Sequence, residues 1–130
     1  MKRRIISLAL VFMMCLTFSI AAMAATTRQA VGSCTLSNSG KKVSYSGYST
    51  STKIEDVISI TVKLMELRNG TWYEIDRAYT SDTHANYVLA SDSVTVTGGY
   101  YYKVIGVHYS KTGSQVTSTE TEGSTVWIGA

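Results

Sequence analysis

Proline is absent from this sequence, and cysteine occurs only twice. Without proline, a β-rich chain has to protect its sheet edges with charge, bulges or glycine. Cys15 lies in an apolar N-terminal segment, so only Cys34 is left if that segment is removed. A single cysteine cannot form an intramolecular disulfide, so the stability of the domain must come from its core. An intermolecular Cys34 disulfide, and hence a Cys34-linked dimer, stays open as an alternative to a buried thiol.

Helical periodicity is also missing beyond residue 24. Serine, threonine, tyrosine and valine dominate there, in short alternating runs that glycine and asparagine interrupt. This pattern is typical of an all-β domain. The absence of helices and the regular spacing of the runs predict an antiparallel sandwich or small barrel of seven to eight strands.

The N-terminus has the three parts of a secretory signal peptide. Lys2, Arg3 and Arg4 are basic, residues 5–20 are almost continuously apolar, and Ala22-Met23-Ala24 offers small residues for cleavage. We therefore predict a helical signal peptide over 1–24, a single domain over 25–130, and an extracellular protein. An uncleaved membrane anchor and a twin-arginine signal are the alternatives.

The basic character of the chain belongs to its N-terminus. Three of the 12 lysines and arginines lie in residues 1–24, so those beyond it equal the 9 aspartates and glutamates in number. The predicted domain then carries no net charge with histidine neutral. It gives no electrostatic reason to expect binding to nucleic acid or to an anionic membrane.

The strands are expected where apolar residues alternate with polar ones. Residues 49–56 are interpreted as a polar connection and 80–90 as the longest irregular stretch. The predicted strands are 31–36, 42–47, 58–67, 71–79, 93–97, 100–109, 115–122 and a short last one at 125–128.

Gly98-Gly99 leads into Tyr100-Tyr101-Tyr102-Lys103-Val104. This resembles the corner of immunoglobulin-like sandwiches at which a tyrosine precedes a core position by two residues. Tyr102 would be that tyrosine and Val104 the core residue. The resemblance favours a sandwich over a barrel, with Tyr102 buried and its hydroxyl bonded to the backbone just before it.

The order of sequence landmarks carries a second resemblance. Ser33-Cys34-Thr35-Leu36, residues 57–62, Asn69-Gly70-Thr71-Trp72 and residues 99–108 follow one another as in a group of short exported proteins of Gram-positive bacteria. That group has no assigned function, and it usually carries arginine where this chain has Lys103. The resemblance implies a secreted bacterial β-domain and brings no catalytic residues.

No arrangement typical of catalysis is present. A metal site at Asp82 and His84 would need further ligands, with Asp92 as the nearest candidate, and a solvated turn is the simpler interpretation. His108 is expected to be half-buried and hydrogen-bonded. Glu120 and Glu122 lie on one strand and are interpreted as a charged edge rather than as paired glycosidase acids. We therefore expect no enzyme, no metal and no cofactor.

Asn69-Gly70 predicts a two-residue hairpin turn. That turn would pair Leu67 with Trp72, Met65 with Glu74 and Glu66 with Tyr73. It would also pair Lys63 with Asp76 as ions and Leu64 with Ile75 in the core. Trp72, Met65 and Leu67 would then lie together on the face opposite Ile60, Val62 and Leu64, as a binding patch or as a small core under a loop.

The strand at 100–109 supplies a second candidate surface. If Tyr102 and Val104 point inward, then Tyr101, Lys103 and Tyr109 point outward. Tyrosine suits recognition surfaces, although the strand could also be buried on both faces. The sequence thus predicts a secreted binding or adhesion module for a protein or glycan, with a subunit of an extracellular assembly, joined through sheet edges or Cys34, as the alternative.

Overall fold

The computed structural model describes residues 30–130. The predicted signal peptide over 1–24, and the start of the predicted domain at residue 25, lie outside the described residues. Cleavage after Ala24 therefore stays a prediction. In the described part of the chain, no helix has the length and hydropathy needed to cross a membrane.

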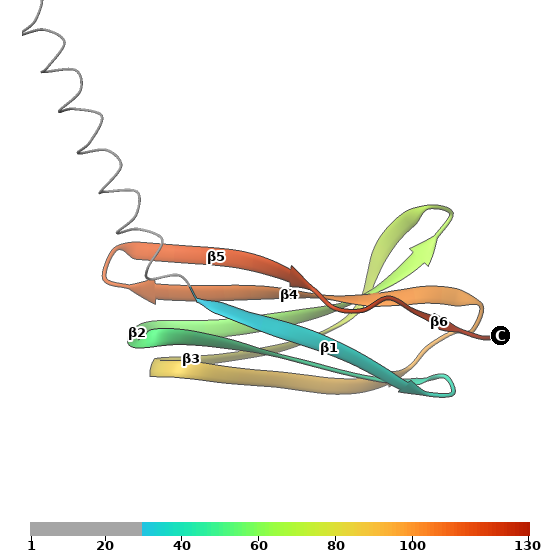
Figure 1. Ribbon diagram of the computed structural model, residues 1–130, viewed down its shortest axis with the longest axis horizontal. Helices are drawn as coiled ribbons and strands as arrows, with labels where there is room; N and C mark the ends of the chain where they lie inside the picture. Colours follow the sequence, from blue (N-terminus) through green and yellow to red (C-terminus); the bar gives the residue numbers. More distant parts are fainter. Residues whose placement is uncertain (1–29) are drawn as a thin grey trace, which may run out of the picture.

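Residues 30–130 form six antiparallel strands and no helix, which confirms the all-β prediction (Figure 1). Strand β2 lies between β1 and β4, and β4 pairs in turn with β5 and β6. Strand β3 pairs with β2 alone. The strands are β1 (Val31–Ser39), β2 (Lys42–Arg68), β3 (Thr71–Thr95), β4 (Tyr100–Thr112), β5 (Gln115–Glu122) and β6 (Val126–Ile128).

The strand number differs from the predicted seven to eight because β2 and β3 are continuous. Strand β2 runs through 49–56, and β3 runs through 80–90, where a connection and an irregular stretch were expected. The β2–β3 register shifts between Thr50 and Glu55, and His84 on β3 has a φ of 48°. A bulge of this kind bends a strand pair without ending it, so two expected breaks are bends within long strands.

The bend divides the sheet into two parts. The first half-sheet contains β1, residues 42–50 of β2 and residues 87–95 of β3. The second half-sheet contains residues 57–68 of β2, residues 71–83 of β3, and β4, β5 and β6. Strands β2 and β3 thus belong to both parts.

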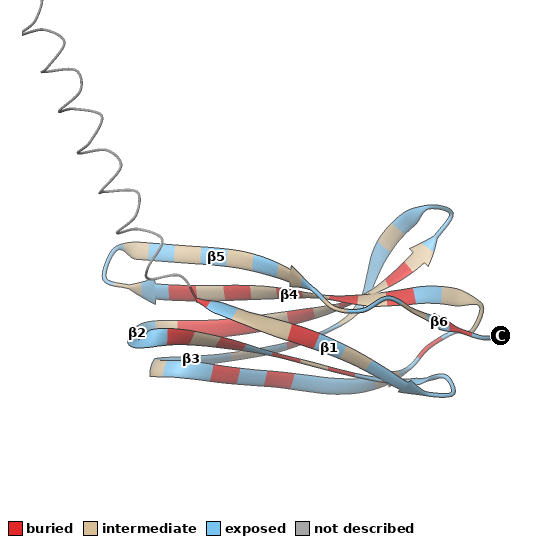
Figure 2. Ribbon diagram, viewed as in Figure 1, coloured by how far each residue is buried: buried red, intermediate tan, exposed pale blue. Residues whose placement is uncertain are grey.

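The two half-sheets face each other across one core. A Cβ atom added to Gly47, on the first half-sheet, would lie 2.6 Å from Cγ2 of Val62, on the second. Buried residues alternate with more exposed ones along β2 and β4, as Figure 2 shows. The core residues are Cys34, Val43, Tyr45, Ile58, Ile60, Val62, Leu64, Ala78, Val88, Ala90, Val96, Tyr102, Val104 and Ile128.

The hairpin turn between β2 and β3 has the predicted form. Asn69 and Gly70 both have positive φ, at 49° and 80°, which is the backbone of a type I′ turn. Leu67 pairs with Trp72, as predicted from that turn. The predicted pairings of Met65 with Glu74 and of Glu66 with Tyr73 are also confirmed.

Beyond Met65 the predicted register is wrong, because β3 has one extra residue there. Leu64 pairs with Asp76 and Lys63 with Arg77, which leaves Ile75 as the residue of the bulge. Ile75 is 36% exposed and is not a core residue. The predicted Lys63–Asp76 ion pair and the Leu64–Ile75 core pair are therefore both absent.

A contact between the half-sheets accompanies this bulge. The hydroxyl of Tyr45, on the first half-sheet, donates a hydrogen bond to Oδ2 of Asp76 at 2.8 Å. The extra residue at Ile75 shifts Asp76 onto the inward side of β3, level with Leu64. The bulge thus exchanges an apolar inward side chain for a polar one that joins the two half-sheets.

The corner before β4 is built as predicted. Tyr102 is 0% exposed, and its hydroxyl donates to the carbonyl oxygen of Thr97, in the connection that precedes the strand. The same hydroxyl lies 2.8 Å from Oε2 of Glu66. Burial, together with the Glu66 carboxylate, raises the pKa of the Tyr102 phenol, so Tyr102 stays a neutral donor.

Candidate binding surface

The side chains that point away from the core on the second half-sheet form its outer face. On β4, the inward residues Tyr102, Val104 and His108 are buried, whereas Tyr101 and Lys103 are not. This confirms the predicted alternation, since successive side chains of a strand point to opposite faces.

Trp72, Met65 and Lys103 lie side by side on the outer face. Met65 pairs with Lys103 on one side and with Glu74 on the other, next to the Leu67–Trp72 pair. The ammonium of Lys103 lies 4.4 Å from the centroid of the Trp72 ring, which is a cation–π contact.

Lys103 also joins this cluster to β5. Its Nζ atom donates to Oε1 of Glu122 at 2.8 Å. The lysine side chain is mostly covered, at 15% exposure, whereas the glutamate is solvated. The Trp72 ring, the Lys103 ammonium and the Glu122 carboxylate thus follow one another across the outer face. The apolar part of the Lys103 side chain lies over the sheet.

Trp72 is half-buried. It is therefore neither fully exposed, as in an open binding patch, nor fully covered, as in a small core under a loop. Trp72 lies on the opposite face from Val62, as predicted, and the charged end of Lys103 covers part of its ring. Figure 1 shows the end of the β2–β3 hairpin projecting beyond the neighbouring strands. The Trp72 cluster is therefore a partly solvated surface with a lysine laid across it.

Tyr101 and Tyr109 lie toward opposite ends of β4. Tyr101 pairs with Trp127 of β6, and the two rings meet at 4.9 Å between centroids, tilted by 59°. Both rings are exposed. Tyr109 lies between Ser59 and Ser118, away from the Trp72 cluster. The six predicted site residues therefore share one face, but only Met65, Leu67, Trp72 and Lys103 gather at one place.

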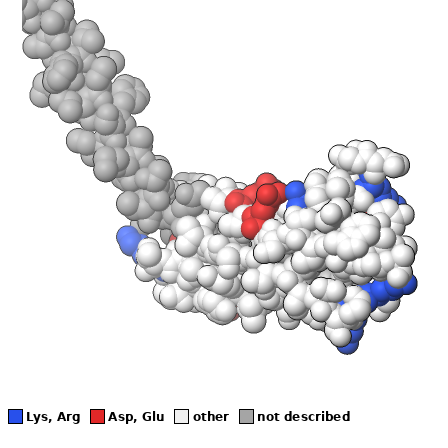
Figure 3. Space-filling view, turned by 45° about the vertical axis from the view of Figure 1, so that its right-hand side comes forward, with Lys and Arg blue, Asp and Glu red and all other residues white. Residues whose placement is uncertain are grey.

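Sequence reasoning missed Trp127 and Glu122 as parts of this surface. Trp127 lies between Val126 and Ile128, and their alternation is the signal that could have revealed an outward tryptophan. Its pairing with Tyr101 depends on a contact between distant segments. Figure 3 shows a surface that is largely uncharged, with charged side chains gathered in a few places.

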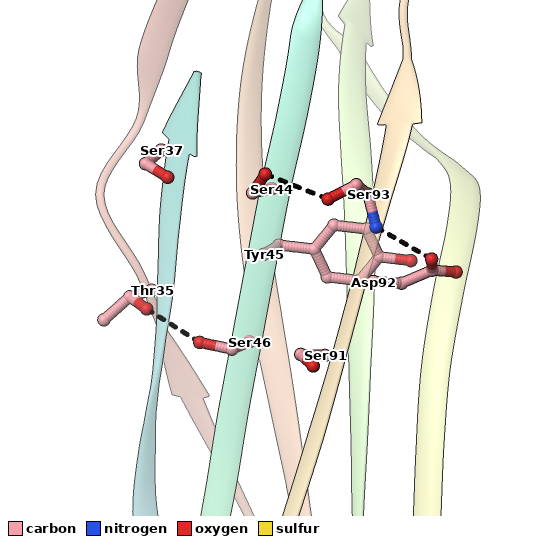
Figure 4. A pocket seen from close by; sticks show the side chains of 8 residues that line it. All are labelled: Thr35, Ser37, Ser44, Tyr45, Ser46, Ser91, Asp92 and Ser93. Carbon is pink, nitrogen blue, oxygen red and sulfur yellow. Dashed lines mark hydrogen bonds between the residues drawn. The ribbon is translucent and has the colours of Figure 1, made fainter. Parts of the chain in front are cut away.

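The first half-sheet carries a different surface, a shallow hydroxyl-lined hollow that Figure 4 shows from close by. Four of its hydroxyls bond in pairs: Ser44 to Ser93 at 2.9 Å, and Thr35 to Ser46 at 3.2 Å. Hydroxyls that are already paired have less to offer a ligand. The lining residues are Thr35, Ser37, Ser44, Tyr45, Ser46, Ser91, Asp92 and Ser93.

His108 is fully buried, not half-buried as expected, and it takes part in a hydrogen-bonded chain. Its Nδ1 lies 2.8 Å from Oγ of Ser49, and its Nε2 lies 2.8 Å from Oγ1 of Thr121. Ser49 donates its own proton to the carbonyl of Ser59, so it accepts from Nδ1, and Thr121 donates to Nε2. Burial lowers the pKa of His108, which keeps the ring neutral.

This serine and histidine cannot act as a nucleophile and its base, because no substrate reaches them. Ser49 and His108 are both 0% exposed. A Cβ atom added to Gly32 would lie 2.7 Å from the imidazole, so the backbone of β1 packs directly against the ring. The pair is a structural link between the half-sheets.

Cys34 is buried, as the sequence suggested, at 6% exposure. Its Sγ atom lies 3.8 Å from Oγ1 of Thr121 and 3.8 Å from the carbonyl oxygen of Val104. Burial raises the pKa of the thiol and disfavours its reactive thiolate. An intermolecular disulfide would require β1 to separate from β5.

The remaining sequence candidates do not form a metal centre. Within residues 30–130, no group of three or more histidine, cysteine, aspartate or glutamate side chains could hold a metal ion. Asp82 accepts the backbone N–H of Thr83 at 2.8 Å, and His84 is exposed. Glu120 and Glu122 are both exposed on β5, in the positions expected of a charged edge.

Comparison with protein-family models, curated proteins and solved structures finds no match for this chain.

Proposed function

We propose that this chain is an exported, immunoglobulin-like β-sandwich that works outside the cell as a non-catalytic binding or adhesion module. The cluster of Trp72, Met65, Leu67 and Lys103 would be the centre of its contact surface. The observation that carries this proposal is the lysine laid over a half-buried tryptophan on an otherwise open sheet face.

The strand pairing supports the immunoglobulin-like fold. One half-sheet has the order β1-β2-β3, the other has the order β3-β2-β4-β5, and one core lies between them. Strands β2 and β3 pass from one half-sheet to the other at the bend between Thr50 and Glu55, and bulges or bends are how strands change sheets. The hydrogen bond from Tyr102 to the Thr97 carbonyl fits the tyrosine corner of such folds.

Export is supported by the N-terminal sequence. The basic residues 2–4, the apolar run over 5–20 and the Ala22-Met23-Ala24 site have the order of a cleaved signal. The likeness to short exported proteins of Gram-positive bacteria points to the same compartment.

The composition of the outer face favours a protein ligand over a glycan. Methionine, leucine and tryptophan lie near its centre beside Lys103, and Glu122 borders them. Protein interfaces are enriched in methionine and aromatic residues at their core and are polar at their rim. Catalysis finds no support, because the only serine–histidine pair among the described residues is sealed in the interior.

The test is a binding screen with residues 25–130 against an array of extracellular proteins and an array of glycans. For any protein that binds, Trp72→Ala and Lys103→Ala should each weaken binding about tenfold or more, as the loss of a central contact does. Tyr87→Ala, which removes an exposed ring from the first half-sheet, is the matched control and should bind like the unchanged chain.

Two outcomes would contradict the proposal. Binding to glycans alone would assign the surface to another ligand class. Binding that survives both Trp72→Ala and Lys103→Ala but is lost in Tyr87→Ala would place the contact on the first half-sheet.

A further inference from the structure

Strand β3 has a free edge along its whole length. It pairs with β2 on one side, and no described strand pairs with its other side. Figure 1 shows β3 along one border of the strand body. A free edge offers unpaired backbone N–H and C=O groups to another strand, so folded proteins normally protect it.

One part of this edge is protected. Over residues 71–83, Ile75 forms a bulge, and Arg77 and Glu74 form an ion pair with Nε 2.6 Å from Oε1. Asp82 adds a further charge to this part. Bulges and charges are the devices that prevent a strand from pairing with another molecule.

The other part of the edge has no such protection. Residues 85–91 contain no charged side chain, and the chain contains no proline. The stretch is bounded by His84 on one side and Asp92 on the other, and both are exposed. Tyr87 and Leu89 point away from the core and are each 52% exposed.

The other free edges in residues 30–130 are partly covered, charged or short. The edge of β1 meets the β5 side of the molecule, where Thr119 donates to the carbonyl of Ala30 at 3.0 Å and Gly123 packs against the backbone of Cys34. Strand β5 carries Glu120 and Glu122, and β6 has only three residues. The stretch 85–91 combines the absence of charge with two exposed apolar side chains, those of Tyr87 and Leu89.

The backbone groups that face this edge can be identified. Asp92 Oδ1 accepts the N–H of Ser93 at 2.7 Å, so that N–H points away from β2. Ser44 and Ser93 are paired, and their hydroxyls lie 2.9 Å apart, as in a pair without ladder hydrogen bonds. Because N–H directions alternate along a strand, residues 87, 89 and 91 present their N–H and C=O groups to the free edge.

We propose that the edge at 85–91 pairs antiparallel with the same edge of a second copy of this chain. A two-fold axis at Val88 would set Tyr87 opposite Leu89 of the partner subunit, and Leu89 opposite Tyr87 of the partner subunit. Both members of each pair present their N–H and C=O groups to the edge, so two hydrogen bonds would form in each. The partly exposed Tyr87 and Leu89 side chains would cover one another.

Charge favours this axis over one at Ser91. An axis at Val88 brings Asp92 opposite His84 of the partner subunit, which places a carboxylate beside an imidazole. An axis at Ser91 would instead bring the two Asp92 carboxylates diagonally together, and like charges across a strand pair are destabilising. Both copies would use this same edge, so the two-fold pairing closes at two subunits.

The experiment measures the mass of the exported chain, residues 25–130, by analytical ultracentrifugation up to about 1 mM. We expect a reversible dimer. Leu89→Pro removes an edge N–H that makes no bond within the subunit, and it should weaken dimerisation about tenfold or more. Leu89→Lys keeps the backbone N–H and adds a charge to the edge, and it should weaken dimerisation to a similar extent. It therefore tests the proposal even if the proline variant fails to fold.

Tyr79→Lys is the matched control, because Tyr79 is an exposed tyrosine on the protected part of β3. It should dimerise like the unchanged chain. A monomer at every concentration would overturn the proposal, as would a dimer that both Leu89 variants leave intact or an open-ended polymer. This inference goes beyond the binding proposal and is independent of it, because Trp72→Ala should leave the dimer unchanged.

Discussion

A few polar residues lie in the interior of this domain, and their buried side-chain atoms are hydrogen-bonded. No buried side-chain nitrogen or oxygen in residues 30–130 lacks a hydrogen-bond partner. Tyr102 joins the corner before β4 to Glu66, and His108 joins Ser49 to Thr121. A buried polar group costs little only while its partners remain, so these residues are the sensitive points of the core.

Replacing Tyr102 with phenylalanine should lower the free energy of unfolding by about 1–2 kcal/mol. The variant keeps the ring but leaves the Glu66 carboxylate and the Thr97 carbonyl without their donor. Urea denaturation would measure the change. Tyr101→Phe, at an exposed position on the same strand, is the control and should leave the midpoint unchanged. Equal midpoints for the two variants would show that the corner bond contributes nothing.

The buried His108 should make the domain less stable in mild acid. Its pKa in the folded chain is below the ordinary 6.5, mainly because burial disfavours the charged ring. The unfolded chain therefore binds a proton that the folded chain does not, so stability is full above pH 6.5 and falls as the pH drops below it. Melting temperatures between pH 7 and about pH 5 would show this.

The exposed His84 provides the control for this pH dependence. His84→Gln should keep the fall in melting temperature, whereas His108→Gln should lose much of it. Where His108→Gln does not fold, imidazole titration by nuclear magnetic resonance gives the same answer. A His108 resonance that titrates at or above 6.5 in the folded chain would contradict the argument.

At the scale of the strands, the features that follow from the alternation of apolar and polar residues can be predicted from the sequence. The features that depend on contacts between distant segments cannot. The inward residues of β4, the Asn69-Gly70 turn and the Leu67–Trp72 pair all follow from a period of two. The Ile75 bulge does not, because its inward Asp76 is held by Tyr45 from the other half-sheet. That contact has no signature in the local pattern of β3.

The same limit applies to the candidate site and to the strand ends. Met65, Leu67, Trp72 and Lys103 could be grouped because hairpin register and strand parity place them together. Trp127 could not be added, since its strand has three residues and its partner Tyr101 is distant in sequence. The bend at 50–55 resembles a connection in sequence, because all of its residues except Ile54 are polar.

The close approach of the half-sheets at Gly47 can be tested directly. Gly47→Ala would place a methyl group 2.6 Å from Cγ2 of Val62, so the strands must move apart. We expect a loss of about 1–3 kcal/mol in the free energy of unfolding, as for other overpacked core positions. Gly129→Ala, where nothing lies within 4 Å of the added atom, is the control. An unchanged urea midpoint for Gly47→Ala would show that the half-sheets adjust freely.

For the molecule as a whole, β1 and β5 close one side of the core around a single thiol. Cys34 contacts Thr121 and Val104 there, and its burial leaves no surface thiol among residues 30–130. If cleavage after Ala24 also removes Cys15, the exported domain depends on no disulfide. Its stability should then be indifferent to the redox state of the medium.

Reductant should therefore change neither the melting temperature nor the mass of the exported chain. Thermal unfolding and ultracentrifugation, each with and without dithiothreitol, measure this, after N-terminal sequencing has established whether the chain begins at Ala25. Any dimer that forms through β3 should persist under reduction. A dimer that dissociates on reduction would instead establish a Cys34 disulfide and show that β1 opens.

The long β2–β3 hairpin has a consequence for how the chain folds. Because the two strands pair from Arg68 and Thr71 as far as Lys42 and Thr95, the ladder can grow outward from one turn by short-range steps. Each step closes almost no new loop, so much of both half-sheets can form before β1 and β4 add their long-range pairings. Changes at the Asn69-Gly70 turn should then slow refolding more than they speed unfolding, which stopped-flow kinetics would reveal; the opposite result would place the turn outside the folding nucleus. The longest hairpin of this domain therefore allows folding to begin with local contacts, although all-β folds usually depend on contacts between distant segments.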